Sequence, residues 1–185
     1  MSELRIKGIK KFYKKREVLQ GIDLQVSSGK CIGILGANGS GKSTLLAILA
    51  GVLKADEGEF LWQDKDMLKD SPLAEKIIGY VPQGTPLLEE LSAWDNLLLW
   101  YDKTRLKKEL EDGVLAMLGI NEFLKVPVCK MSGGMKKRLA IGCSVAGNPT
   151  VLLMDEPFSA LDMQNRHKLQ SQLIGVWKRF ENTIV

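Results

Sequence analysis

The residues with the clearest chemical purpose form a glycine-rich run that fits the pattern G-x-x-x-x-G-K-[ST]. The apolar residues 31–35 before it have the composition of a buried strand, and residues 45–50 after it are typical of a helix ended by Gly51. Glycines let backbone N–H groups converge on a phosphate, and the positive end of the helix favours the same anion. Lys42 would reach the β- and γ-phosphates, and the Ser43 hydroxyl would take one position on Mg²⁺. The predicted phosphate-contacting residues are Gly36, Ala37, Asn38, Gly39, Ser40, Gly41, Lys42, Ser43 and Thr44.

A pair of carboxylates, Asp155 and Glu156, follows the apolar run 151–154. An apolar run without alternation is typical of a parallel strand covered on both faces. Asp155 can hold Mg²⁺, directly or through water, as the partner of Ser43. Glu156 can polarise a water for attack on the γ-phosphate. The alternative, a strand end followed by an acidic turn, is disfavoured by the phosphate loop in the same chain.

Three weaker candidates have ordinary structural alternatives. Tyr13 can stack on an adenine ring or be a half-buried strand tyrosine. Gln83 ends a predicted strand, where its amide can reach the metal or the attacking water, and otherwise it is a surface glutamine. The helix start at Ser132, Gly133 and Gly134 is an anion-binding end or only a capped helix.

The elements that position these residues alternate between strand and helix patterns. Residues 3–26 predict short antiparallel strands with a polar break at 14–16, and residues 56–62 and 77–83 predict further strands. Residues 84–148 have helical character, with a capping box at Ser92–Asp95 and a helix over 107–118. The turn 159–162 leads into a helix to about residue 180, buried at Leu169, Leu173 and either Val176 or Trp177, and residues 182–185 begin another strand.

The bulk composition favours an ordinary globular protein. The chain has 185 residues, 45% of them hydrophobic, and a net charge of +4. Basic runs such as 136–138 are interpreted as solvated faces, so no nucleic-acid partner is expected. The three cysteines have no metal spacing and are typical of reduced thiols in a cytosolic protein. No apolar stretch approaches the roughly 20 residues that span a bilayer, so a membrane role would require a partner.

Taken together, these motifs resemble the nucleotide-binding domain of ATP-binding cassette (ABC) transporters over essentially the whole chain. Tyr13 matches the family's adenine-stacking aromatic, and Gln83 matches the glutamine of its Q-loop. Residues 36–44 match the Walker A loop, and residues 151–156 match the Walker B strand. Residues 131–135 match the family signature, and residues 159–162 match the D-loop. The resemblance implies an α/β fold: a P-loop NTPase core with a mixed or parallel sheet flanked by helices, an antiparallel β subdomain, and an α-helical subdomain inserted at about 84–148. It implies ATP and Mg²⁺ as cofactors, Glu156, Lys42 and Gln83 as catalytic residues, and Ser43, Gln83 and Asp155 as metal ligands. Ser132, Gly133 and Gly134 would bind the ATP held by a partner cassette.

Two departures from the family pattern affect these expectations. Met135 replaces the common glutamine of the signature, and the basic residues after it resemble bacterial export systems more than importers. The family's switch histidine has no counterpart, because His167 lies on the preceding helix and is expected at the surface. We therefore expect a chain that lacks the C-terminal part of the domain, binds nucleotide and hydrolyses it poorly.

The resemblance also predicts partners. We expect a head-to-tail dimer with a second copy or a homologous cassette, two ATP molecules between the protomers, and separate transmembrane permease subunits. The chain would then be cytoplasmic, peripheral on the inner face of the cell membrane. The alternatives are a soluble ABC-type ATPase acting on ribosomes or DNA, and a different P-loop enzyme such as a small-molecule kinase.

Overall fold

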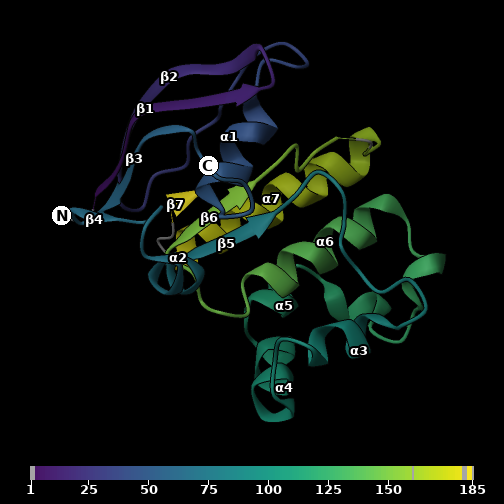
Figure 1. Cartoon of the computed structure of the whole chain (residues 1–185). Coiled ribbons are helices and arrows are strands. Elements are labelled where there is room, and N and C mark those ends of the chain that lie inside the picture. Colours follow the sequence, from purple (N-terminus) through teal and green to yellow (C-terminus); the bar gives the residue numbers. More distant parts are fainter. Residues whose placement is uncertain (1–2, 160, 181–182, 185) are drawn as a thin grey trace. The chain divides into compact units, whose positions relative to one another are not determined.

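The structure is a computed structural model that describes residues 3–159, 161–180 and 183–184 (Figure 1). The chain divides into two compact units. The first contains Met1–Pro82, Pro149–Asp155 and Glu181–Val185, and the second contains Gln83–Asn148 and Glu156–Phe180. Each unit has its own elements and its own buried apolar residues.

An antiparallel sheet in the first unit confirms the alternating pattern near the N-terminus. Its strand order is β2-β1-β3-β4, with β1 at Glu3–Tyr13, β2 at Arg16–Ser27, β3 at Glu57–Trp62 and β4 at Lys65–Asp66. Strands β1 and β2 are longer than the short strands expected. The polar break contains only Lys14 and Lys15, because Arg16 already belongs to β2 and pairs with Tyr13. Lys14 adopts φ 57°, which allows this tight turn.

A parallel sheet in the same unit has the order β5-β6-β7. It consists of β5 at Ile78–Val81, β6 at Val151–Met154 and β7 at Thr183–Ile184. All of β6 is buried, as its unbroken apolar run predicts. Of the strand expected over 182–185, Thr183 and Ile184 are confirmed, while Asn182 and Val185 lie outside the described residues.

Helix α1, Lys42–Leu49, packs into a core that joins both sheets (Figure 1). Its Leu45, Leu46, Ile48 and Leu49 cluster with Leu4 and Phe60 of the antiparallel sheet and Leu153 of the parallel one. Helix α2, Ser71–Ile77, has no counterpart in the sequence prediction. Its signal is Asp70, whose side chain accepts a hydrogen bond from Leu73 N at 3.1 Å, followed by a proline in the first turn.

The buried strand predicted over residues 31–35 is wrong. Cys31 forms only an isolated bridge, and residues 32–37 have no regular secondary structure. Ile32 and Ile34 pack against the core, whereas Cys31 is exposed and Leu35 is 95% exposed. The alternation gives an extended segment with one covered side, but a strand also needs a run of ladder hydrogen bonds with a neighbour. The apolar composition contains no information about that neighbour.

The second unit is helical, as expected for residues 84–148. Its helices are α3 at Ala93–Leu98, α4 at Lys103–Glu111, α5 at Val114–Met117, η1 at Ile120–Phe123, η2 at Val128–Lys130, α6 at Gly133–Ser144 and α7 at Met163–Phe180. The capping box is confirmed, with Ser92 and Asp95 bonding each other's backbone N–H. The stripe on α7 is confirmed at Leu169 and Leu173, and Val176, which is 3% exposed, completes it.

The single helix predicted over 107–118 is instead two helices, α4 and α5. Gly113 has a non-helical conformation between them, and the Glu109 carboxylate accepts a hydrogen bond from Val114 N at 2.9 Å. A Cβ on Gly113 would lie 2.6 Å from Glu109 Cα, so only glycine allows this sharp break. The predicted apolar stripe survives, since Leu110, Val114, Leu115 and Leu118 are all buried.

The interpretation of residues 136–138 as a solvated face is wrong for Lys137 and Arg138, whereas Lys136 is partly exposed and pairs with Glu89. Lys137 is 4% and Arg138 is 6% exposed. Both belong to α6 and have carbonyl oxygens of the second unit as hydrogen-bond acceptors. In the described parts of the chain, none of the helices has the length and apolar character that a bilayer-spanning segment needs.

Candidate functional site

The glycine-rich loop ends at Gly41, directly before the first residue of α1. Gly41 is the N-cap with φ 96°, and a Cβ there would lie 2.7 Å from Leu19 Cδ2 and 3.1 Å from Val18 O. Glycine is therefore required at this position both for its conformation and for space. The N–H groups of the first turn of α1 have no acceptor within the helix, which suits an anion.

The Lys42 side chain folds back over the loop that precedes it. Its Nζ donates hydrogen bonds to Gly36 O at 2.8 Å and to Ala37 O at 2.9 Å. The positive charge is thus held over the loop residues that the sequence predicts to contact phosphate. An ammonium next to the N–H groups of a helix start can hold a negatively charged group.

The structure brings Ser43 and Asp155 together from α1 and the end of β6. Ser43 Oγ donates a hydrogen bond to Asp155 Oδ1 at 3.0 Å, although 112 positions separate them in sequence. Asp155 is 3% exposed, and its backbone N donates to Val81 O at 2.9 Å. Burial, and secondarily the Asp155 carboxylate, raise the pKa of Tyr80.

This pair fits magnesium. Mg²⁺ prefers oxygen ligands and is commonly bound by one or two protein side chains together with phosphate oxygens and water. Ser43 and Asp155 supply a hydroxyl and a carboxylate in hydrogen-bond contact, beside the loop held by Lys42. The described residues contain no group of three or more His, Cys, Asp or Glu side chains that could hold a metal by themselves.

Tyr13 is the last residue of β1 and is 46% exposed. The Nζ atom of Lys11 lies 6.0 Å from the centre of its ring. The ring is accessible to a ligand, as base stacking requires.

Gln83 and Glu156 meet in the second unit. Gln83 Nε2 donates a hydrogen bond to Glu156 Oε2 at 2.9 Å. Glu156 adopts φ 47°, an uncommon conformation for a residue other than glycine. Its carbonyl oxygen accepts hydrogen bonds from Ser159 N at 3.1 Å and Ser159 Oγ at 2.9 Å, which hold this conformation.

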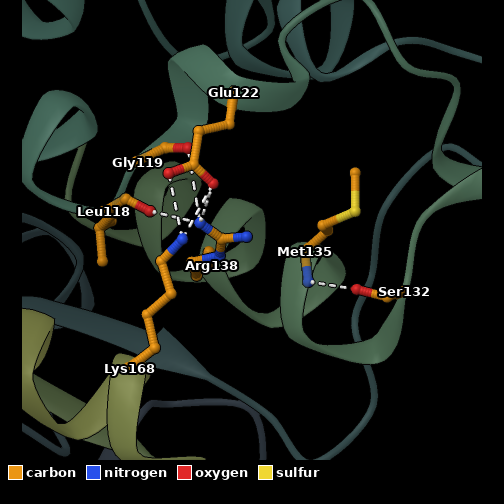
Figure 2. A network of polar contacts seen from close by, with 7 residues as sticks. All are labelled: Leu118, Gly119, Glu122, Ser132, Met135, Arg138 and Lys168. Carbon is orange, nitrogen blue, oxygen red and sulfur yellow. Dashed lines mark hydrogen bonds and ion pairs between the residues drawn. The ribbon is translucent and has the colours of Figure 1, made fainter. Parts of the chain in front are cut away.

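The Ser132-Gly133-Gly134 sequence starts α6. Figure 2 shows Ser132 Oγ accepting a hydrogen bond from Met135 N at 3.3 Å, so the serine is a helix cap. A Cβ on Gly134 would lie 3.1 Å from Asn165 Oδ1 on α7, so this glycine allows close packing of the two helices. Asn165 is fixed by Asp162, whose Oδ1 accepts from Asn165 N at 2.9 Å. This hydrogen bond lowers the pKa of Asp162.

A polar network holds the middle of α6 (Figure 2). Arg138 Nη1 donates to Leu118 O at 3.2 Å and lies 3.3 Å from Glu122 Oε2. The guanidinium carbon is 4.8 Å from the centre of the Phe123 ring. Lys168 Nζ on α7 contacts both Glu122 carboxylate oxygens at 3.0 Å. The Lys168 contact, followed by that of Arg138, lowers the pKa of Glu122.

The predicted site residues therefore fall into two groups. Lys42, Ser43 and Asp155 lie together in the first unit, where Tyr13 also lies. The second unit contains Gln83 with Glu156, the Ser132–Gly134 helix start, and the turn at 159–162, of which Ala160 lies outside the described residues. His167 is exposed, as expected.

Sequence reasoning missed Lys137, whose Nζ donates to Gln83 O at 3.3 Å. Its nearness to the signature was the only available signal, because the acceptor lies 54 positions away in sequence.

Comparison with known proteins identifies one family. The sequence pattern described as ABC transporter matches residues 19–159. The linearmycin resistance ATP-binding protein LnrL of Bacillus subtilis is 35% identical over 171 residues, which cover 90% of this chain and 55% of that protein. The methionine import ATP-binding protein MetN of Clostridioides difficile is also 35% identical, over 98% of this chain and 59% of that protein. The chain thus spans little more than half the length of these relatives.

Solved structures show the same fold. The cbiO1 protein of Clostridium perfringens, described as part of the ABC transporter complex cbiONQ, superposes with a TM-score of 0.84 at 28% identity, covering 98% of this chain and 76% of that one. An ATP-binding cassette in a dimeric post-hydrolysis state with ADP and phosphate has a TM-score of 0.84 at 27% identity, covering 98% of this chain and 86% of the other. The expected P-loop NTPase fold with an antiparallel β subdomain is therefore confirmed.

Proposed function

This chain belongs to the ABC transporter family, and from that membership we propose that it binds MgATP and hydrolyses it, at a low rate in this chain, as the ATP-binding part of a membrane transporter. In this proposal residues 1–185 form one ABC-type domain with a helical insertion at about 84–148. The observation that carries it is the hydrogen bond between Ser43 and Asp155 beside the loop held by Lys42. It pairs a hydroxyl at a helix start with a carboxylate at a strand end, a donor set that suits a phosphate-bound magnesium ion.

In the proposed reaction the residues of the first unit bind and neutralise the nucleotide. The loop 36–41 and the first turn of α1 donate N–H groups to the phosphates, and Lys42 supplies positive charge. Ser43 and Asp155 would hold Mg²⁺, which when bound neutralises charge that develops on the phosphate oxygens. Tyr13 would stack on the base.

The second unit would act on the attacking water. Glu156 is the proposed general base, a role worth typically 10²–10⁴-fold in rate. Gln83 would orient the Glu156 carboxylate through the hydrogen bond between them. We also propose Gln83 as a ligand of Mg²⁺. Ser132, Gly133 and Gly134 would contact the nucleotide of a second cassette, so that ATP joins two protomers.

We propose transmembrane permease subunits as further partners, which would place the protein peripherally on the cytoplasmic face of the membrane. Components of transporter complexes among the similar proteins support this. We propose export as the direction, supported by Met135 with the basic residues 136–138 after it. The names of similar proteins include both import and export. One of the export proteins is Nod factor export ATP-binding protein I of Rhizobium sp., which is 35% identical over 90% of this chain and 56% of that protein.

Isothermal titration calorimetry with MgATP tests the nucleotide site. The wild-type chain should release heat that falls when Mg²⁺ is removed by EDTA. Lys42→Ala and Asp155→Asn should each weaken binding at least tenfold, whereas Cys31→Ser, an exposed change near the loop, should not. No heat from a folded wild-type sample, or unchanged affinity in both variants, would refute the proposal.

Hydrolysis is tested separately, by phosphate release. Glu156→Gln keeps the shape of the side chain and removes the base, so it should retain MgATP binding while losing at least 10²-fold in kcat. Equal turnover by the wild type and this variant would remove Glu156 from the mechanism.

A further inference from the structure

Lys137 is buried beside the residues that we propose to act on water, although the proposed reaction gives it no role. The residue is 4% exposed, and lysine is almost never buried so completely without polar partners. Its Nζ donates to Gln83 O at 3.3 Å, and Gln83 Nε2 donates to Glu156 Oε2 at 2.9 Å. Two hydrogen bonds through one glutamine therefore connect the ammonium to the carboxylate.

We infer that Lys137 is a positioning residue, which holds the backbone at Gln83 so that the glutamine amide stays on the Glu156 carboxylate. The inference rests on the proposed function, because that function assigns the role of base to Glu156. Lys137 touches neither nucleotide nor water in this account.

The two residues joined by the amide–carboxylate hydrogen bond, Gln83 and Glu156, differ in how firmly their backbones are held. Glu156 has its backbone fixed by the two hydrogen bonds from Ser159. Gln83 is exposed, and an exposed glutamine side chain samples many rotamers unless its backbone and amide are restrained. Because a hydrogen bond from a charged donor is stronger than one between neutral groups, Lys137 is suited to restrain it.

The helix that carries Lys137 is itself held from the side. Arg138, the next residue, is fixed by Leu118 O, Glu122 and the Phe123 ring. Successive helix residues point about 100° apart, so the two cations anchor α6 to different neighbours. The same helix begins at the Ser132–Gly134 sequence. Lys137 lies about one helical turn after Gly133, so the first turn of α6 connects this helix start to Gln83.

Steady-state ATPase assays on the full chain test the inference. Lys137→Met keeps the unbranched side chain as far as the ε position and removes the Nζ donor, so kcat should fall roughly tenfold while KM for MgATP changes less than about twofold. Lys137→Arg restores a charged donor and should recover most of the rate. Lys136→Met is the matched control, because Lys136 pairs with Glu89 at the surface and should leave kcat unchanged. In a Gln83→Ala background, Lys137→Met should have no further effect.

A second measurement does not depend on turnover. The side-chain amide signals of ¹⁵N-labelled Gln83, assigned by their loss in Gln83→Ala, should be displaced from free-glutamine positions in the wild type and in Lys137→Arg. In Lys137→Met they should move to the free positions, with circular dichroism confirming that the variant is folded. If the wild type binds no MgATP, the proposed function fails. If it binds MgATP but shows no turnover, only the hydrolysis step of that proposal fails. In either case these signals alone decide the inference. In an active wild type, an unchanged kcat or unchanged signals in Lys137→Met overturns it.

Discussion

Replacing Arg138 by methionine should destabilise the second unit by about 2–3 kcal/mol, mostly through lost contacts to carbonyl oxygens and an aromatic ring. The change leaves Leu118 O, a buried acceptor, without its donor at 3.2 Å. An unsatisfied buried acceptor costs roughly 1–3 kcal/mol, and a cation–π contact such as that with Phe123 contributes about 0.5–2 kcal/mol. Methionine recovers part of the latter through its sulfur.

The ion pair with Glu122 should contribute little. The Glu122 side chain is 56% exposed, and exposed pairs are worth about 0–1 kcal/mol. Glu122→Gln should therefore cost less than about 1 kcal/mol at neutral pH, clearly less than Arg138→Met. Arg166→Met, a change at an exposed arginine on α7, is the matched control and should be nearly neutral.

Urea unfolding followed by tryptophan fluorescence measures these differences. Three of the four tryptophans, Trp94, Trp100 and Trp177, lie in the second unit, so the signal reports mainly on it. With a slope of about 2 kcal/mol per molar urea, Arg138→Met should lower the midpoint by about 1 M or more. If Glu122→Gln lowered the midpoint as much as Arg138→Met, the ion pair would dominate and the reasoning would be refuted.

Two further predictions concern pH and backbone geometry. The pKa of Glu122 lies below its usual value of 4.5 in the folded state, so its contribution is complete above about pH 4.5 and is lost as pH falls through the lower folded value. Acid titration of stability should thus be flatter below pH 4.5 in Glu122→Gln, and identical slopes would contradict this. Gly58→Ala should cost more than about 3 kcal/mol, because φ is +102° and a Cβ would lie 2.6 Å from Gly8 O. Gly21→Ala, with φ +87° and open space, should cost only about 1 kcal/mol. Both glycines lie in the first unit, so urea unfolding is followed here by circular dichroism, and equal losses would refute the clash.

Features set by neighbouring residues could be predicted from the sequence. The start of α1 at a glycine-lysine-serine turn, the capping box at Ser92 and Asp95, and the buried stripe of α7 each depend on a few nearby side chains. The continuous apolar run of β6 likewise predicts burial on both faces. The pairing of Ser43 with Asp155 followed because motif chemistry links a helix start to a strand end.

Features that depend on distant partners could not be predicted. Residues 31–35 have the composition of a strand, but composition does not specify which edge would pair with them. Lys137 and Arg138 look like solvent-facing charges until their acceptors, Gln83 O and Leu118 O, are known. The break at Gly113 is an exception, because its cause is local: the Glu109 carboxylate takes the place of a helical hydrogen bond, and apolar spacing alone does not report it.

The parallel pairing of β5 with β6 has a consequence for how the chain folds. Residues 82–150, which include most of the helical unit, must be enclosed in a loop before Val81 can lie beside Met154. Loop closure of this length carries an entropic cost, and such non-local pairing slows folding. Helices α3 to α6 make contacts close in sequence and emerge from the ribosome before β6 does, so they can form early. The hydroxyl of Ser43 therefore meets the carboxylate of Asp155 only late in folding, after the alignment of β6.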